Sequence, residues 1–285
     1  MEVKRILVRL RLVLRRLSVK NKVLILSLVV GCASGLSAVL LRSLVELIKT
    51  WTGADVAGPG NWRYLILPGI GMLISLFLLK NVIKDNISHG VTKVLVAVSR
   101  NESRIKPHNM WSSILTSALT IGFGGSVGAE APIVYTGAAI GSNFARYIGL
   151  SYRNMTLMLG CGAAGAIAGI FKAPLAGVIF TMEVLLFNVT MTSILPLLLS
   201  TVSATVIAYI FTGHNAIFEC TLSPFAMVNL PFYVLLGIVC GFGSLYFTRM
   251  TLWLEDKFGN FRSPYVKWAF CAVCRRPVQN ARRLC

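Results

Sequence analysis

Charged residues are scarce in this chain. Only 13% of its 285 residues are charged, ten residues are acidic, and 55% are hydrophobic, with a mean hydropathy of +0.72. Soluble globular domains carry about a quarter charged residues, so the composition disfavours a soluble enzyme. Charge-free stretches include Val23–Leu41, Asn109–Ala129 and Cys220–Thr248. Because a helix needs about 20 mostly apolar residues to cross a membrane, we expect an all-α polytopic membrane protein with about eight or nine helices of unequal length.

The residue patterns of metal and catalytic sites are also missing. The seven cysteines are scattered, and their odd number does not describe a disulfide framework. Cys271 and Cys274 form a lone C-x-x-C pair, without the second pair that would complete a zinc site. The chain also lacks a metal-ligand motif such as H-E-x-x-H. We therefore expect no metal and no cofactor, and an intramembrane enzyme with Glu130 as general base is the weakest hypothesis.

The positive charge is concentrated at the N-terminus. The formal net charge is +18, and residues 1–22 carry eight lysines and arginines against the single acid Glu2. On a helical wheel the apolar residues of this segment share one face and most charges share the other, which predicts an interfacial helix. A nucleic-acid-binding arm fits this apolar face poorly, and a signal peptide would need a cleavage site that is missing. By the positive-inside rule, we expect a cytoplasmic N-terminus, with the lipid bilayer rather than nucleic acid as partner.

The acids of the central region single out one position. Between Glu102 and Glu219 the sequence contains only two acids, Glu130 and Glu183. Glu130 follows several glycines and precedes Pro132, a pattern that predicts a chain break and a new helix near Glu130, inside the membrane. The free amides and positive dipole end of such a helix attract an anion, and the Glu130 carboxylate would compete for the same place. Alternatively, Glu130 is a favourable first-turn acid at a membrane surface, and the glycines are close-packing contacts between helices.

Two sequence blocks carry a resemblance to a known family. Residues Gly128–Pro132, G-A-E-A-P, resemble the G-x-E-G-P signature of the CLC family of chloride channels and chloride/proton antiporters, with Ala131 in place of the second glycine. Residues Gly162–Gly165 and Phe171–Glu183 resemble the family's G-A-A-A-G and F-x-A-P-L-A-G blocks, at the spacing that the family requires. The resemblance, which is to the bacterial type, extends over about residues 23–256.

The resemblance implies a function and a set of site residues. The function is transmembrane transport of chloride or a similar small anion, by a channel or an antiporter, with Glu130 as a gate that competes with the anion. The implied anion-binding residues are Ser88, His89, Gly90, Gly128, Ala129 and Ala131. Chloride is then the transported ion, and no cofactor is implied.

Two departures from the family pattern affect the mechanism. The upstream G-S-G-I-P signature is replaced by Ser88–Thr92, S-H-G-V-T, so an imidazole N–H would take the place of a serine hydroxyl, unless His89 is simply a loop histidine. Val184 stands where antiporters of the family have a proton-transfer glutamate, which argues against tight proton coupling. We expect Glu183 to have a structural role at a helix end. Lys172 either raises the local potential for anions or snorkels to the interface, and we favour the second reading.

The resemblance covers mainly the first half of a family member. We expect a basic interfacial helix at 1–22, a first-half transmembrane repeat at 23–212, a connecting segment with the first helix of the second half at 213–256, and a basic tail at 257–285. The tail is either a cytoplasmic end or out-of-frame translation, and we favour the second. A truncated, non-transporting fragment is therefore the alternative function. Residues Val178–Leu186 and Ile194–Phe211 resemble the family's dimer-interface helices, which implies a homodimer in the inner plasma membrane if the protein is complete.

Overall fold

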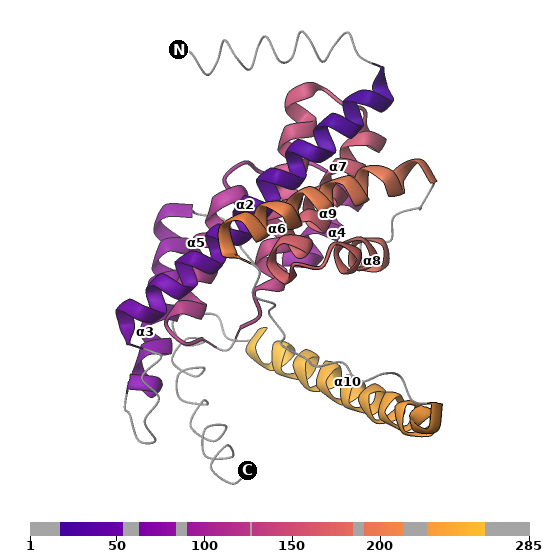
Figure 1. Cartoon of the computed structure of the whole chain (residues 1–285). Coiled ribbons are helices and arrows are strands. Elements are labelled where there is room, and N and C mark those ends of the chain that lie inside the picture. The colour runs from indigo at the N-terminus through magenta and orange to yellow at the C-terminus, as the bar shows by residue number, and fades with distance from the viewer. Residues whose placement is uncertain are drawn as a thin grey trace. The chain divides into compact units, whose positions relative to one another are not determined.

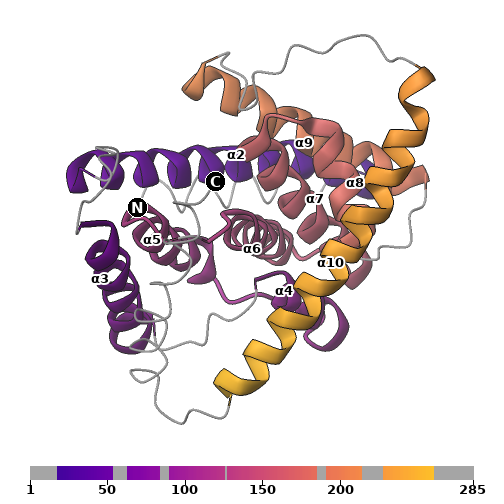
Figure 2. The same ribbon diagram turned by 90° about the horizontal axis from the view of Figure 1, so that it is seen from below.

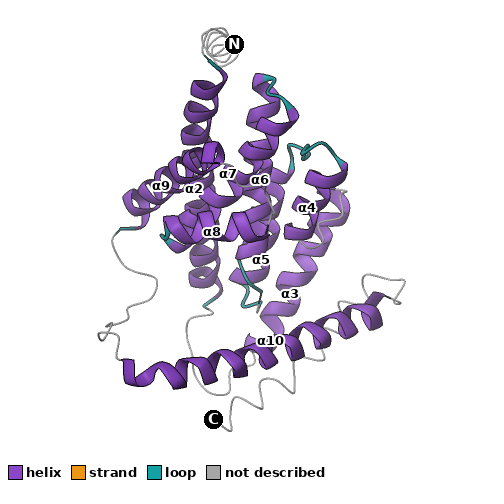
Figure 3. Cartoon of the chain, turned by 90° about the vertical axis from the view of Figure 1, so that its right-hand side faces the viewer, coloured by secondary structure: helices purple, strands orange, loops and turns teal. Residues whose placement is uncertain are grey.

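The computed structural model describes residues 18–53, 63–83, 90–125, 127–184, 191–213 and 227–259. Every regular element in these ranges is a helix, as Figure 3 shows, so the predicted all-α fold is confirmed. Most of the predicted interfacial helix at 1–22 and of the tail at 257–285 lies outside the described residues, as do Ser88 and His89. The chain divides into two units, Met1–Ile217 and Phe218–Cys285.

The helices differ greatly in length. The first unit contains α2 (Val19–Thr52), α3 (Arg63–Leu78) with a following π turn (Leu79–Ile83), α4 (Gly90–Arg100), α5 (Asn109–Gly122), α6 (Glu130–Ile148), α7 (Tyr152–Phe171), α8 (Pro174–Val184) and α9 (Met191–Thr212). The second unit contains α10 (Leu230–Gly259), preceded by a short 3-10 turn (Met227–Asn229). In the described part of the chain, α2, α7, α9 and α10 are long and apolar enough to cross a membrane. Helices α4 and α8 have only 11 residues each, so the expectation of unequal helix lengths is confirmed.

Helix α2 begins before the predicted boundary at residue 23. It starts at Val19, so Lys20 and Lys22 belong to the same continuous helix as the charge-free run that follows them. Gly53, at φ 63°, ends the helix in the left-handed conformation that glycine adopts without strain. Between these ends, the 34-residue helix runs beside α9 and α7 (Figure 1).

Helix α7 is the centre of the first unit. Its residues from Met155 to Gly169 are nearly all buried, and α2, α6, α8 and α9 all pack against it (Figure 2). A methyl group on Gly162 would collide with the carbonyl oxygen of Gly137 in α6, and one on Gly137 would collide with that of Gly162. Likewise, a methyl group on Gly177 of α8 would collide with the Ala164 carbonyl oxygen. Small residues at helix crossings let backbones approach closely, a common arrangement in membrane proteins.

Buried hydroxyl groups add hydrogen bonds between these helices. Ser200 Oγ in α9 donates to the Cys161 carbonyl of α7 at 2.7 Å. Ser75 Oγ in α3 donates to the Thr116 carbonyl of α5 at 3.2 Å. Such hydrogen bonds stabilise membrane helix packing by about 0.6 kcal/mol each on average. They therefore supplement the glycine contacts rather than replace them.

Lys172 joins the α7–α8 junction to the end of α9. It terminates α7 in a left-handed conformation, with φ 55°. Its side chain is buried, its Nζ donates a 2.8 Å hydrogen bond to the Gly213 carbonyl just beyond α9, and the same atom lies 5.3 Å from the centre of the Tyr209 ring. A cation is favourable at the C-terminal end of a helix because of the helix dipole. Lys172 is therefore held within the unit, contrary to the expectation that it snorkels to the interface.

Candidate functional site

The helical structure is interrupted between α5 and α6, at the position that the glycines predict. Helix α5 ends at Gly122, and the next helix begins at Glu130, the residue singled out from the sequence. Gly124 takes φ +84°, and the Gly125 N–H donates to the Thr120 carbonyl at 2.8 Å. A methyl group on Gly125 would collide with that same carbonyl oxygen. Glycine at these two positions therefore allows the chain to fold back tightly against the end of α5.

The start of α6 offers backbone donors. Ala129 precedes the helix without any side-chain capping bond, and the first helical hydrogen bond runs from Ile133 N–H to the Ala129 carbonyl at 3.2 Å. The N–H groups of Glu130 and Ala131 therefore have no acceptor within the helix, and Pro132 has no N–H at all. The positive end of a 19-residue helix dipole lies at the same place. These features are favourable for an anion.

The side chain of Glu130 folds back over the loop in front of its own helix. Its carboxylate Oε2 lies so close to Gly128 that a methyl group on Gly128 would overlap it. The Glu130 side chain is nevertheless exposed, and Gly128 is exposed as well. The carboxylate thus lies exposed against Gly128, and within the described part of the chain it forms no ion pair.

Helix α4 brings a second predicted segment to the same place. Gly90 is its first residue, and a methyl group there would collide with the Ala131 carbonyl oxygen and approach Tyr135 Cβ to 3.2 Å. The start of α4 therefore lies against the first turn of α6. The structure thus brings Gly90, Gly128, Glu130 and Ala131 together, while Ser88 and His89 lie outside the described residues.

Two residues at this helix crossing were not predicted from the sequence. Lys93, in the first turn of α4, places its Nζ 5.9 Å from the centre of the Tyr135 ring in α6. Tyr135 is buried, with 5% of its surface exposed, and Lys93 is half-buried. A cation in this region raises the electrostatic potential for anions. The sequence did contain a signal for Lys93, because it is a cation only three residues after Gly90, a predicted anion-binding residue.

The position expected for a proton-transfer acid lies at another helix end. Val184 is the last residue of α8, is half-buried, and packs against the apolar cluster that includes Val94, Val134 and Ala163. Glu183, beside it, is exposed. Within the described residues, no group of three or more histidine, cysteine, aspartate or glutamate side chains could hold a metal ion. The described site combines the N–H groups at the start of α6 with an exposed carboxylate, and such a helix start is favourable for an anion.

Comparison with known families fits this arrangement. Residues 70–279 match the family described as "Voltage gated chloride channel". The chain belongs to this family. The matched range contains Gly90 and the whole of the α5–α6 break.

Individual members of the voltage gated chloride channel family are distant from this chain. The "Putative chloride channel protein ClcB-like" of Ralstonia nicotianae is 27% identical over 200 residues, which cover 66% of this chain and 47% of that protein. The "H(+)/Cl(-) exchange transporter ClcA" of Yersinia pestis is 25% identical over 253 residues, which cover 84% and 52%. The chain thus spans about half the length of these curated relatives.

The family fold is confirmed by solved structures. A slow cyanobacterial Cl⁻/H⁺ antiporter superposes with a TM-score of 0.75 at 22% identity, covering 89% of this chain and 61% of the antiporter. A CLC-type fluoride/proton antiporter gives 0.68 at 23% identity, with 84% and 60% covered. At these identities the likeness shows the fold alone. The family itself is shown by the match over residues 70–279, as the resemblance predicted.

Proposed function

We propose that the protein transports chloride or a similar small anion across the membrane, with Glu130 as the gate. The observation that carries this proposal is the Glu130 carboxylate folded over Gly128, immediately before the start of α6. An ionised carboxylate there competes with a free anion for the same dipoles. Protonation removes the negative charge, so we expect anion access to increase as the pH falls. The relatives named as chloride channels and exchangers support this reading.

The proposed anion contacts come from two helix ends. The amides of Ala129, Glu130 and Ala131 would donate from the α6 side, next to Gly128. Ser88, His89 and Gly90 would provide the second contact, and the packing of Gly90 on Ala131 supports bringing that segment to the site. Backbone donors of this kind need no bound metal or cofactor, and we propose none. Half-helix ends that face a substrate near the membrane midplane are a recurrent transporter arrangement.

Proton coupling is proposed to be weak. Val184 cannot bind a proton, and it occupies the position where the resemblance places the proton-transfer glutamate of antiporters. The relatives and the solved neighbours include both a named channel protein and named antiporters, so the names are consistent with either mode. The absence of an ionisable group at position 184 supports the channel-like mode.

The domain organisation, the dimer and the membrane location are also proposals. The chain spans about half of its curated relatives, so we propose residues 23–212 as the first transmembrane repeat and α10 as the opening helix of the second. A homodimer through α8 and α9 is supported by their exposed apolar side chains, which include Leu175, Ile179, Leu195 and Ile210. We further propose an inner plasma membrane location with a cytoplasmic N-terminus, from the basic residues that precede α2.

Chloride efflux from liposomes tests the proposed gate. The complete protein should release chloride faster at low pH, and Glu130→Gln should make the flux nearly independent of pH. Glu183→Gln is the matched control because it removes the other acid of this region, and it should leave the pH dependence intact. An unchanged pH response in Glu130→Gln would exclude Glu130 as the gate.

The same assay separates the proposal from its alternative. If the 285-residue chain releases no chloride while a version completed with the second half does, this chain is a non-transporting fragment. Flux from the 285-residue chain itself would reject the fragment reading. The Glu130→Gln variant is then tested in the version that releases chloride, whether that is the 285-residue chain or the completed one.

A further inference from the structure

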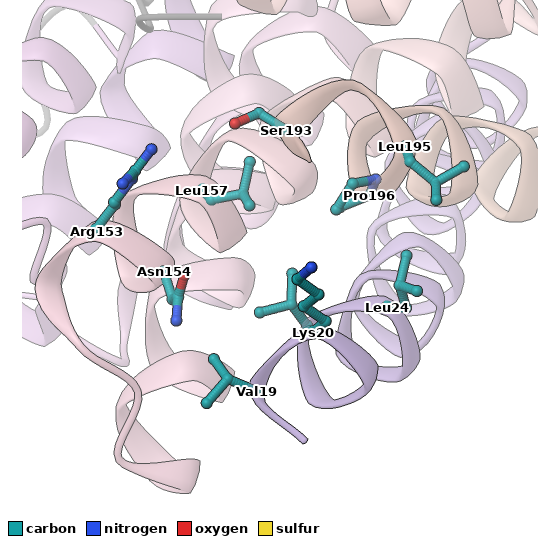
Figure 4. Close-up of a pocket in the computed structure, with 10 residues that line it drawn as sticks. Val19, Lys20, Leu24, Arg153, Asn154, Leu157, Ser193, Leu195 and Pro196 are labelled. Atoms are coloured by element: carbon teal, nitrogen blue, oxygen red, sulfur yellow. The ribbon is translucent and has the colours of Figure 1, made fainter. Parts of the chain in front are cut away.

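A cavity of about 520 Å³ opens where three membrane helices begin. It is lined by the first turns of α2, α7 and α9, and Figure 4 shows their side chains around one space, with Lys20 reaching into it. The lining residues are Val19, Lys20, Val23, Leu24, Arg153, Asn154, Leu157, Ser193, Leu195 and Pro196. This cavity is distinct from the candidate anion site, because none of these residues belongs to α4 or α6.

The polar part of this cavity is positively charged. Lys20 of α2 and Arg153 of α7 supply two cations, while Asn154 and Ser193 add neutral hydrogen-bonding groups. Among the described residues that line the cavity, none is acidic. Three helices also begin here, and each contributes the positive end of its dipole. The complementary ligand is therefore an anion with several acceptor oxygens.

The apolar part of this cavity excludes a simple hydrated anion as the best ligand. Val23 and Pro196 form a buried base, Leu24 and Leu157 are half-buried, and Leu195 remains 58% exposed. A free phosphate or sulfate would gain nothing from these leucines. A molecule with an anionic head and a hydrocarbon chain would satisfy the cations and cover the leucines at once.

The place of the cavity in the membrane selects the same ligand. By length and composition α2, α7 and α9 can each cross a membrane, so we expect their first turns at the level where spanning helices meet the headgroups. Basic pockets between membrane helices at this level are typical sites for anionic lipid headgroups. Anionic phospholipids are also the anions present there at the highest local concentration.

We propose that this cavity binds an anionic glycerophospholipid. Its phosphate lies between Lys20 and Arg153, and its acyl chain follows the apolar wall of Leu24, Leu157 and Leu195. The lipid would bridge α2, α7 and α9 at the ends where these helices begin. This binding does not depend on anion transport, so it is testable in a protein that conducts nothing.

Native mass spectrometry of the purified chain in detergent measures this binding. With added phosphatidylglycerol, one lipid should remain bound per chain, and phosphatidylcholine should be retained less. Lys20→Gln with Arg153→Gln should weaken phosphatidylglycerol binding by about fivefold for each lost cation, roughly 25-fold together. The matched control is Lys22→Gln with Arg146→Gln, which removes the same charge from residues that do not line the cavity.

A steric variant separates the cavity from general surface charge. Leu157→Trp keeps both cations and fills the apolar wall, so it should reduce phosphatidylglycerol binding while the control pair does not. Equal lipid retention in the Lys20/Arg153 variant and the control pair would overturn the proposal, as would equal retention of phosphatidylcholine. Displacement of the lipid by millimolar inorganic phosphate would overturn it too, since the site would then take a free anion.

Discussion

The carboxylate of Glu130 lies against the Cα atom of Gly128, two residues earlier, in a space that no other amino acid could leave open. The position of the acid depends on the glycine, because the carboxylate occupies the space that a side chain at position 128 would fill. Both belong to the G-A-E-A-P block.

Gly128→Ala should displace the Glu130 carboxylate from its resting position. The added methyl group would overlap Oε2, which is the far end of a flexible side chain, so the carboxylate should swing away at little cost to the fold. Chloride efflux at neutral pH should increase, and its pH dependence should weaken. Efflux from liposomes at two pH values measures both effects.

The Glu130→Gln background provides the control for Gly128→Ala. If the alanine acts through the carboxylate, the double variant should behave like Glu130→Gln alone, so the two effects are not additive. A further increase of flux in the double variant would show that Gly128 acts on the pathway independently of Glu130.

Val184 predicts weak proton coupling. In liposomes with an imposed chloride gradient, the complete protein should move little or no proton, whereas Val184→Glu should gain proton movement because it introduces a titratable group at the end of α8. A pH-sensitive dye inside the liposomes reports the movement. Uphill proton transport by the unmodified protein would contradict the prediction. If that transport were lost in Glu183→Gln, Glu183 would be the residue that transfers the proton.

Gly162→Ala should destabilise the α6–α7 crossing. The new methyl group would meet the Gly137 carbonyl oxygen, a backbone atom that cannot rotate away. We expect a loss of about 1–3 kcal/mol, measured as a lower unfolding temperature in detergent. Gly165→Ala in the same helix is the graded control, because its nearest neighbour is the Ser200 hydroxyl at 3.0 Å, a side chain that can shift. Equal losses at the two positions would contradict the steric explanation.

Lys172→Met should also lower stability, for an electrostatic reason. The buried ammonium donates to the Gly213 carbonyl, and a hydrogen bond from a charged group contributes about 1.5–3 kcal/mol. Arg42→Met is the contrasting variant, because it removes an exposed ion pair with Glu46, in which the two side chains are 38% and 62% exposed. An exposed pair is expected to contribute about 0–1 kcal/mol. In thermal unfolding measured in detergent, Lys172→Met should therefore lower the unfolding temperature much more than Arg42→Met does.

Local signals in the sequence predicted the starting point of the site. The glycines before Glu130 and the proline after it predict a break and a helix start, and α6 begins at Glu130. Such rules work because φ freedom and a missing N–H are properties of single residues. The charge-free runs likewise predicted helices of unequal length, because a run must be about 20 residues long to cross the hydrocarbon and the runs differ in length.

Contacts between distant segments could not be predicted in this way. The packing of Gly90 on Ala131 and the position of Lys93 over Tyr135 depend on how α4 meets α6 in three dimensions. The buried hydrogen bond of Lys172 depends on where α9 ends, and a lysine near a helix end more often reaches the interface. Hydrophobic patterning describes one helix at a time, so it gave no information about these partners.

The mutual contact of Gly137 and Gly162 limits how this molecule can move. With each backbone already touching the other, α6 cannot slide or rotate on α7 without opening a gap or creating a clash. The start of α6 is thereby fixed in place, while the side chain at its first residue remains free to swing. For the gate proposed above, we therefore expect opening by rotamer exchange of the Glu130 side chain, on the picosecond-to-nanosecond scale of exposed side-chain flips.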